Sequence, residues 1–195
     1  MKSGEKVRII YGKDALHGMH GFRAVFEYFG QDTSVVLVDT EDKLRAAFAD
    51  ATPYSVTLML CHGWGKTEED AVICWTLHRP VNEIEWENYE LHWTASNVRD
   101  YVTCGSGVLV NTACWSGKQM WADVFLESGF GSYVAPEKTS DMFSAYQFIA
   151  ALIGYLVYEG RDYGARLVTI QEAVELARKL DDFWDGANGF RLFGG

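Results

Sequence analysis

The chain lacks any run of apolar residues long enough to cross a bilayer, and its first residues lack the apolar core of a secretion signal. We therefore expect a cytoplasmic protein that does not bind membranes. Basic residues are scarce as well: 17 Lys and Arg stand against 27 Asp and Glu, which gives a formal net charge of −10. This balance argues against nucleic acid as a partner, because phosphate backbones bind basic surfaces.

Cysteine occurs only four times, and its spacing has neither of the patterns that would tie it to a structural role. The short intervals of a disulfide-stapled domain are absent, and so are the paired ligands of a structural zinc site. The glycine spacing of a phosphate-binding loop is missing after the first predicted strand, at Gly12-Lys13-Asp14-Ala15. We therefore expect free thiols, no metal site and no cofactor.

What the chain has is an alternation of buried strands and amphipathic helices along its whole length, without repeats, linkers or low-complexity segments. Apolar runs predict strands over 7–12, 34–39, 54–61, 72–77, 90–93, 107–112, 131–136 and 189–193. Apolar residues at helical spacing predict helices over 18–29, 40–49, 94–101, 117–127, 141–159 and 168–180. This order predicts one α/β domain over residues 1–195, a three-layer αβα sandwich with a mostly parallel sheet.

Two of the predicted strands end in a reactive side chain. Leu58-Met59-Leu60-Cys61 leads into His62-Gly63, and Val108-Leu109-Val110-Asn111-Thr112-Ala113 leads into Cys114. The carboxyl ends of parallel strands meet at one edge of a sheet, where open α/β sheets bind their ligands. Histidine beside cysteine is the minimum set for nucleophilic catalysis by a thiol. The two motifs therefore predict a thiol active site at this edge.

The order of these motifs, 52 residues apart, resembles the caspase-like (clan CD) cysteine peptidases, and most of all their bacterial CHAT-type branch. The similarity covers most of the chain from residue 54 onward. Besides the two motifs, it rests on four later segments: Tyr133–Pro136, Ser144–Ile149, Gln171–Ala177 and Phe190–Gly194. The resemblance implies a caspase-like sheet and a cysteine endopeptidase that acts on a protein or peptide substrate.

In the chemistry that the resemblance implies, Cys114 attacks the scissile carbonyl and forms a thioester acyl-enzyme. His62 acts as general base and then as general acid toward the leaving amine. The backbone N–H groups of Gly63 and Cys114 form the oxyanion hole, and the missing side chain of Gly63 lets its amide approach the substrate closely. We name no third catalytic residue, because the family does not require one.

Specificity and regulation follow less directly from the sequence. Trp64 and Trp115 flank the reactive residues and are candidates for a substrate-binding wall. Asp141 is the best acidic candidate for a pocket that selects a basic residue before the cleaved bond. An activating partner is compatible with the resemblance, and the terminal strand offers a sheet edge through which two copies can form a homodimer.

Two alternatives remain open at this point. One is a catalytically silent caspase-like domain that serves as a binding or signalling module. The other is a different α/β protein, such as a flavodoxin-like ligand binder or a thiol amidase. Thiol amidases of the glutamine-amidotransferase type place the histidine after the cysteine, whereas His62 precedes Cys114 here. That order argues against them.

Overall fold

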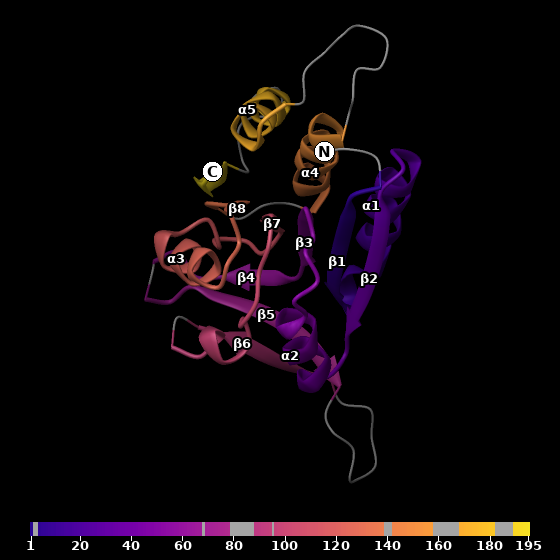
Figure 1. Cartoon of the computed structure of the whole chain (residues 1–195). Helices are drawn as coiled ribbons and strands as arrows, with labels where there is room; N and C mark the ends of the chain where they lie inside the picture. Colours follow the sequence, from indigo (N-terminus) through magenta and orange to yellow (C-terminus); the bar gives the residue numbers. More distant parts are fainter. Residues whose placement is uncertain are drawn as a thin grey trace, which may run out of the picture.

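The computed structural model describes residues 1, 4–67, 69–78, 88–94, 96–138, 142–157, 168–181 and 189–195. Its main sheet has the strand order β2-β1-β3-β7-β8-β9 (Figure 1). All neighbouring strands in it are parallel except β8 and β9, which are antiparallel. The strands are β1 (Lys6–Gly12), β2 (Asp32–Val38), β3 (Val56–Leu60), β7 (Val108–Asn111), β8 (Ser132–Pro136) and β9 (Phe190–Gly194).

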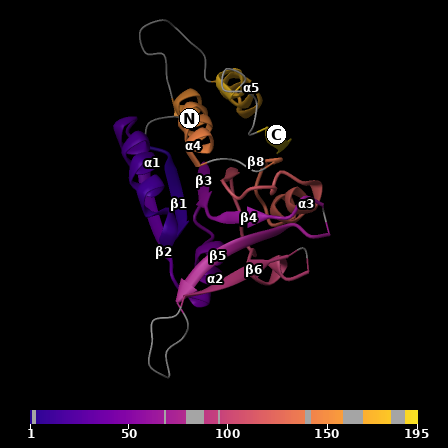
Figure 2. The same ribbon diagram turned by 180° about the vertical axis from the view of Figure 1, so that it is seen from behind.

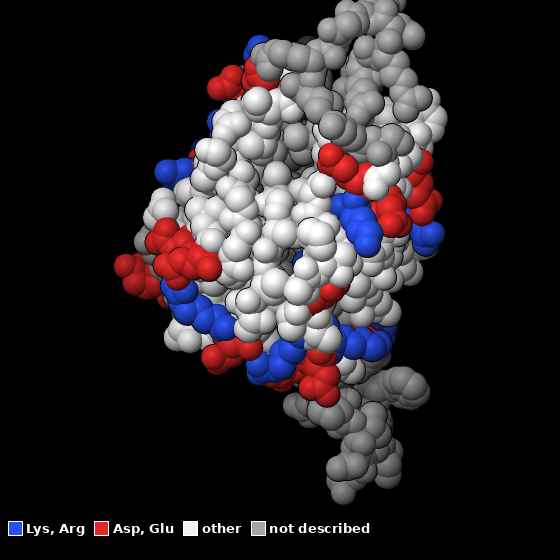
Figure 3. Space-filling model, in the orientation of Figure 1, with Lys and Arg blue, Asp and Glu red and all other residues white. Residues whose placement is uncertain are grey.

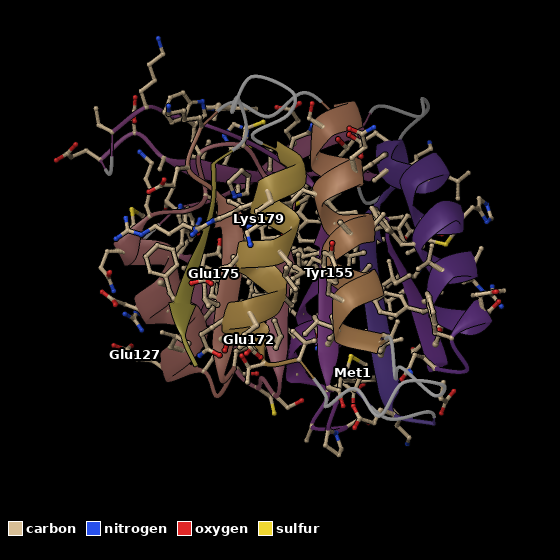
Figure 4. The ribbon with its side chains drawn as sticks, turned by 90° about the horizontal axis from the view of Figure 1, so that it is seen from above. Met1, Glu127, Tyr155, Glu172, Glu175 and Lys179 are labelled. Atoms are coloured by element: carbon tan, nitrogen blue, oxygen red, sulfur yellow. The ribbon has the colours of Figure 1, made fainter. Side chains whose placement is uncertain are left out.

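Helices cover both faces of this sheet. One layer contains α1 (Leu16–Tyr28), α4 (Met142–Val157) and α5 (Ile170–Asp181), which Figure 4 shows over the same face. The opposite layer contains α2 (Glu41–Ala49) and α3 (Gln119–Glu127). Each layer has its own apolar core: Phe22, Phe148 and Leu152 belong to the first, whereas Phe48 and Phe125 belong to the second. The predicted three-layer α/β sandwich is confirmed.

The central strands are buried on both sides because helices pack against each face. All five residues of β3 and all five of β8 are buried. Parallel strands in this position read as nearly continuous apolar runs, which is why the sequence identified them. In the described part of the chain, no helix combines the length and the apolar character needed to cross a membrane.

A second, antiparallel sheet packs beside the layer of α2 and α3. It consists of β4 (His62–Trp64), β5 (Val72–His78) and β6 (Asn88–Trp93), in that order (Figure 2). Its aromatic side chains enter the core: the Trp93 ring lies 5.3 Å from that of Phe48 and 5.5 Å from that of Trp75, between ring centroids. The strands predicted over 72–77 and 90–93 are therefore present as β5 and β6, and β4 adds a third strand to them.

The predicted helix over 94–101 is wrong in type and length. Only a 3₁₀ turn over Val98–Asp100 forms there. The side chain of Asn97 accepts a hydrogen bond from the backbone N–H of Thr94 (2.8 Å) and donates one to the carbonyl of His92 (3.0 Å). These local side-chain bonds compete with the helical pattern and turn the chain back toward α2.

Charged side chains of both signs are interspersed around the rim of the face shown in Figure 3, and uncharged residues occupy its centre. Several charges on the molecule pair across one helical turn, as Arg23 does with Glu27 and Arg45 with Glu41. The net charge of −10 is therefore not gathered into one acidic patch on this face.

Candidate functional site

The candidate site is a cavity of about 160 Å³ at the carboxyl edge of the main sheet. Its walls come from the segments after β1, β3 and β7 and from the first turns of α4. The lining residues are Asp14, Ala15, Cys61, His62, Thr112, Cys114, Ala145 and Tyr146. In the main sheet, β2 lies on one side of β1, and β3, β7 and β8 follow on the other side. The chain therefore extends the sheet in opposite directions from β1 and from β3. Ligands of doubly wound sheets bind at this switch point.

His62 is held by a carboxylate. Its Nε2 lies 2.5 Å from Oδ2 of Asp14, which follows β1 in a short 3₁₀ turn over Lys13–Ala15. This hydrogen bond is the main reason why the pKa of His62 is raised and that of Asp14 lowered. A hydrogen bond from Thr76 of β5 also stabilises the Asp14 carboxylate. The pair therefore favours a charged imidazolium beside the cavity.

Cys114 lies in a tight turn between β7 and α3. The backbone N–H of Ser116 donates to the carbonyl of Ala113 (3.3 Å), so Cys114 and Trp115 are the two central residues of the turn. Trp115 has a φ of +61°, and among the described residues it is the one non-glycine residue with a positive φ. A reactive residue at a sharp strand-to-helix turn is well exposed to substrate. The half-buried Cys114 has this placement.

The segments of His62 and Cys114 approach each other at Gly63. A Cβ atom added to Gly63 would lie 2.5 Å from the carbonyl oxygen of Cys114, 2.9 Å from the Cβ of Ala113 and 3.1 Å from the carbonyl oxygen of Val72. Real Cβ atoms essentially never come within 3.0 Å of such a neighbour. Glycine is therefore required here so that β4 can pass directly beside the turn that holds Cys114.

The structure brings together only part of the predicted set. His62 and Cys114 line the same cavity, whereas neither Trp64 nor Trp115 belongs to its wall. Trp64 is 43% exposed and stands edge-on to the ring of His92, and the Trp115 ring lies 5.7 Å from Nζ of Lys118. Asp141 lies outside the described residues. The oxyanion hole of Gly63 and Cys114 stays a prediction.

Sequence reasoning missed Asp14 and Tyr146. Asp14 lies two residues after the end of a buried strand, so the rule that located His62 and Cys114 was sufficient to find it. Tyr146 had no such signal, because it reaches the cavity from α4 through contacts with α1. A Cβ atom at Gly18 would lie 2.2 Å from its hydroxyl oxygen, and its ring is edge-on to that of Phe22 at 5.2 Å. Within the described ranges no cluster of His, Cys, Asp and Glu could hold a metal ion.

Comparisons with known proteins identify no family. No family model matches the chain, and no curated protein matches it. Among solved structures, it is similar to one described as the "last common ancestor of HMPPK and PLK/HMPPK vitamin kinases". That likeness has 12% sequence identity and a TM-score of 0.35 and covers 92% of this chain and 99% of the other. At this TM-score it carries no argument about the activity of the chain.

These findings overturn the caspase-like prediction. No family model matches the chain, so none supports a CHAT-type domain, and no curated protein matches it either. We therefore correct the predicted cysteine endopeptidase and the silent caspase-like alternative together. The physical reason is that a polar residue and a glycine after a buried strand mark the carboxyl edge of doubly wound sheets in general. The motifs of His62 and Cys114 indicate that edge of the sheet, and they do not indicate membership of a family.

Proposed function

We propose that this protein is a thiol-dependent enzyme that transfers an acyl group from a small donor molecule, with Cys114 as the carrier. The observation that supports this proposal is the meeting of a carboxylate, an imidazole and a thiol in one cavity at the switch point of the sheet. Asp14, His62 and Cys114 reach it from three different strand ends. Such sets activate a cysteine nucleophile in enzymes of unrelated folds.

Each residue has a defined part in the proposed reaction. The Cys114 thiolate attacks the carbonyl carbon of the donor, and the leaving group departs with a proton from the His62 imidazolium. The acceptor then attacks the thioester, gives its proton to His62 and releases Cys114 as thiolate. Asp14 keeps the imidazole oriented and stabilises its charged form, in line with the raised pKa of His62.

The cavity favours a small acyl group. Its volume of about 160 Å³ is below the roughly 300–1,000 Å³ of common ligand pockets. Ala15 and Ala145 supply methyl groups to the wall. We therefore propose a short-chain acyl donor such as an acetyl thioester.

We further propose that the enzyme works in the cytoplasm. All four cysteines are free thiols, which is the usual state in a reducing compartment. A thiol carrier also needs reducing conditions in order to escape oxidation.

Intact-mass spectrometry after incubation with the acetyl thioester of N-acetylcysteamine tests the proposal. We expect one added acetyl group that maps to Cys114 and is released by neutral hydroxylamine, as thioesters are. Cys114→Ser and His62→Gln should abolish this adduct. Cys104→Ser is the matched control, because Cys104 is a partly buried thiol that precedes β7 at the opposite end of the sheet. Acetylation elsewhere, or labelling that survives in Cys114→Ser, would overturn the proposal.

A further inference from the structure

A fully buried polar network lies beneath the turn that carries Cys114. At its centre is Asn111, the last residue of β7, which has no exposed surface. Its Nδ2 donates to Oγ of Ser116 and to the hydroxyl of Tyr133, each at 3.0 Å. Its Oδ1 accepts from the backbone N–H of Ala113 (2.9 Å) and from the thiol of Cys61 (3.5 Å). Both donors and both lone pairs of the amide are therefore used.

The partners of Asn111 return their own hydrogen bonds to the same turn. The Tyr133 hydroxyl donates to the carbonyl of Ser116 (3.0 Å), and the Ser116 hydroxyl donates to the carbonyl of Ala113 (2.6 Å). Burial raises the pKa of Tyr133, so its hydroxyl keeps the proton that it donates. Each hydrogen bond of the network involves Asn111 at the end of β7 or a residue of the turn that follows it. A fully satisfied buried network of this kind specifies one local conformation.

That conformation is one which the turn would otherwise avoid. A left-handed backbone is unfavourable for a residue with a bulky side chain, and Trp115 adopts it at a φ of +61°. Two further hydrogen bonds join the segment to the end of β8 and to the residues that follow it. The N–H of Trp115 donates to the carbonyl of Lys138 (3.2 Å), and that of Gly117 donates to the carbonyl of Pro136 (2.8 Å). The buried network and these two backbone hydrogen bonds together hold the turn in its strained conformation.

We propose that Asn111, Ser116 and Tyr133 are positioning residues that force the left-handed turn and thereby hold the Cys114 thiol in the cavity beside His62. None of the three lines the cavity, so they act through Cys114 and do not touch the substrate. The inference rests on the proposed function for its role in catalysis. The position and reactivity of the thiol can be measured without any substrate, however, and the test uses that difference.

The test begins with Tyr133→Phe, which removes one hydroxyl and keeps the ring. We expect Cys114 to react with iodoacetamide about two- to tenfold more slowly, the factor that corresponds to one lost hydrogen bond. With the acetyl donor, kcat should fall while KM stays the same. Ser116→Ala is the second variant, in case Tyr133→Phe folds poorly.

A rescue experiment separates positioning from general destabilisation. Glycine adopts a φ of +61° without strain, so Trp115→Gly should restore the reactivity of Cys114 when combined with Tyr133→Phe. The control is Tyr54→Phe. That change also removes a hydroxyl, which bonds to Oδ2 of Asp50 at 3.0 Å, but it lies just before β3, at the other end of the sheet. It should leave the reactivity of Cys114 unchanged.

The outcomes are distinct. If Tyr133→Phe and Ser116→Ala keep the wild-type rate of alkylation, or if glycine at position 115 restores nothing, the network is merely structural and the inference is wrong. If alkylation slows and is rescued while the wild-type protein never takes up acetyl groups, the inference stands and the acyl-transfer proposal fails. Slower alkylation, its rescue and an intact KM together support both.

Discussion

Gly63→Ala tests the close approach of β4 to the Cys114 turn. The added Cβ would meet two backbone oxygens and one Cβ at 2.5–3.1 Å, so backbone has to move instead of a flexible side chain. Overpacking of this kind costs about 1–3 kcal/mol. For a chain of this size, each kcal/mol lowers the melting temperature by about 2–4 °C, so we expect a drop of about 2–12 °C.

Gly21→Ala is the matched control, because it adds the same methyl group to another glycine. Gly21 is exposed in α1, and an added Cβ would have no neighbour within 4 Å. Alanine in a helix interior is favoured over glycine by about 1 kcal/mol, so this variant should be more stable than wild type. Thermal unfolding followed by circular dichroism measures the melting temperature of both variants. Equal or higher stability of Gly63→Ala would refute the argument, and so would similar shifts in the two variants.

Four further predictions concern the site and the core. Asp14→Asn should lower the pKa of His62, which an NMR titration measures. The wild type should be more stable than this variant at pH values between the lowered pKa of Asp14 and the raised pKa of His62. It should lose this advantage at lower and at higher pH. At pH 8, iodoacetamide should label Cys114 faster than Cys74, whose pKa burial raises to about 12, as peptide mapping will show. Phe148→Ala should cost about 3–5 kcal/mol in urea unfolding, since it removes a ring stacked on Phe190 of β9 at 4.0 Å. If the edge of β9 forms a homodimer, the mass in light scattering will double with concentration, and a monomeric mass throughout would contradict it.

The main sheet was predictable from sequence because burial on both faces leaves a plain signal. All five residues of β3 and of β8 are buried, and a continuous apolar run between two helical patterns is typical of a parallel strand. The same pattern located the carboxyl edge of the sheet. His62 and Cys114 could therefore be placed near each other from the sequence alone.

The remainder of the site depends on contacts between segments that have no shared pattern. The hydrogen bond between Asp14 and His62 depends on the pairing of β4 with β5. A sequence of three residues that includes a glycine does not predict a strand, so this pairing could not be foreseen. The left-handed Trp115 is set by buried partners on another strand, and tryptophan has no preference for that conformation. Family membership was mispredicted for a related reason: the motifs reflect the geometry of strand ends, which unrelated α/β proteins share.

Cys61 is the single residue between β3 of the main sheet and β4 of the second sheet, so His62 and Cys114 are supported by different sheets. Side chains alternate between faces along a strand, which gives this linker a parity. Insertion of one residue at Cys61 would turn His62 to the opposite face of β4 and away from Asp14, while an insertion of two would preserve the face. The length of this junction therefore sets the direction in which the His62 side chain faces.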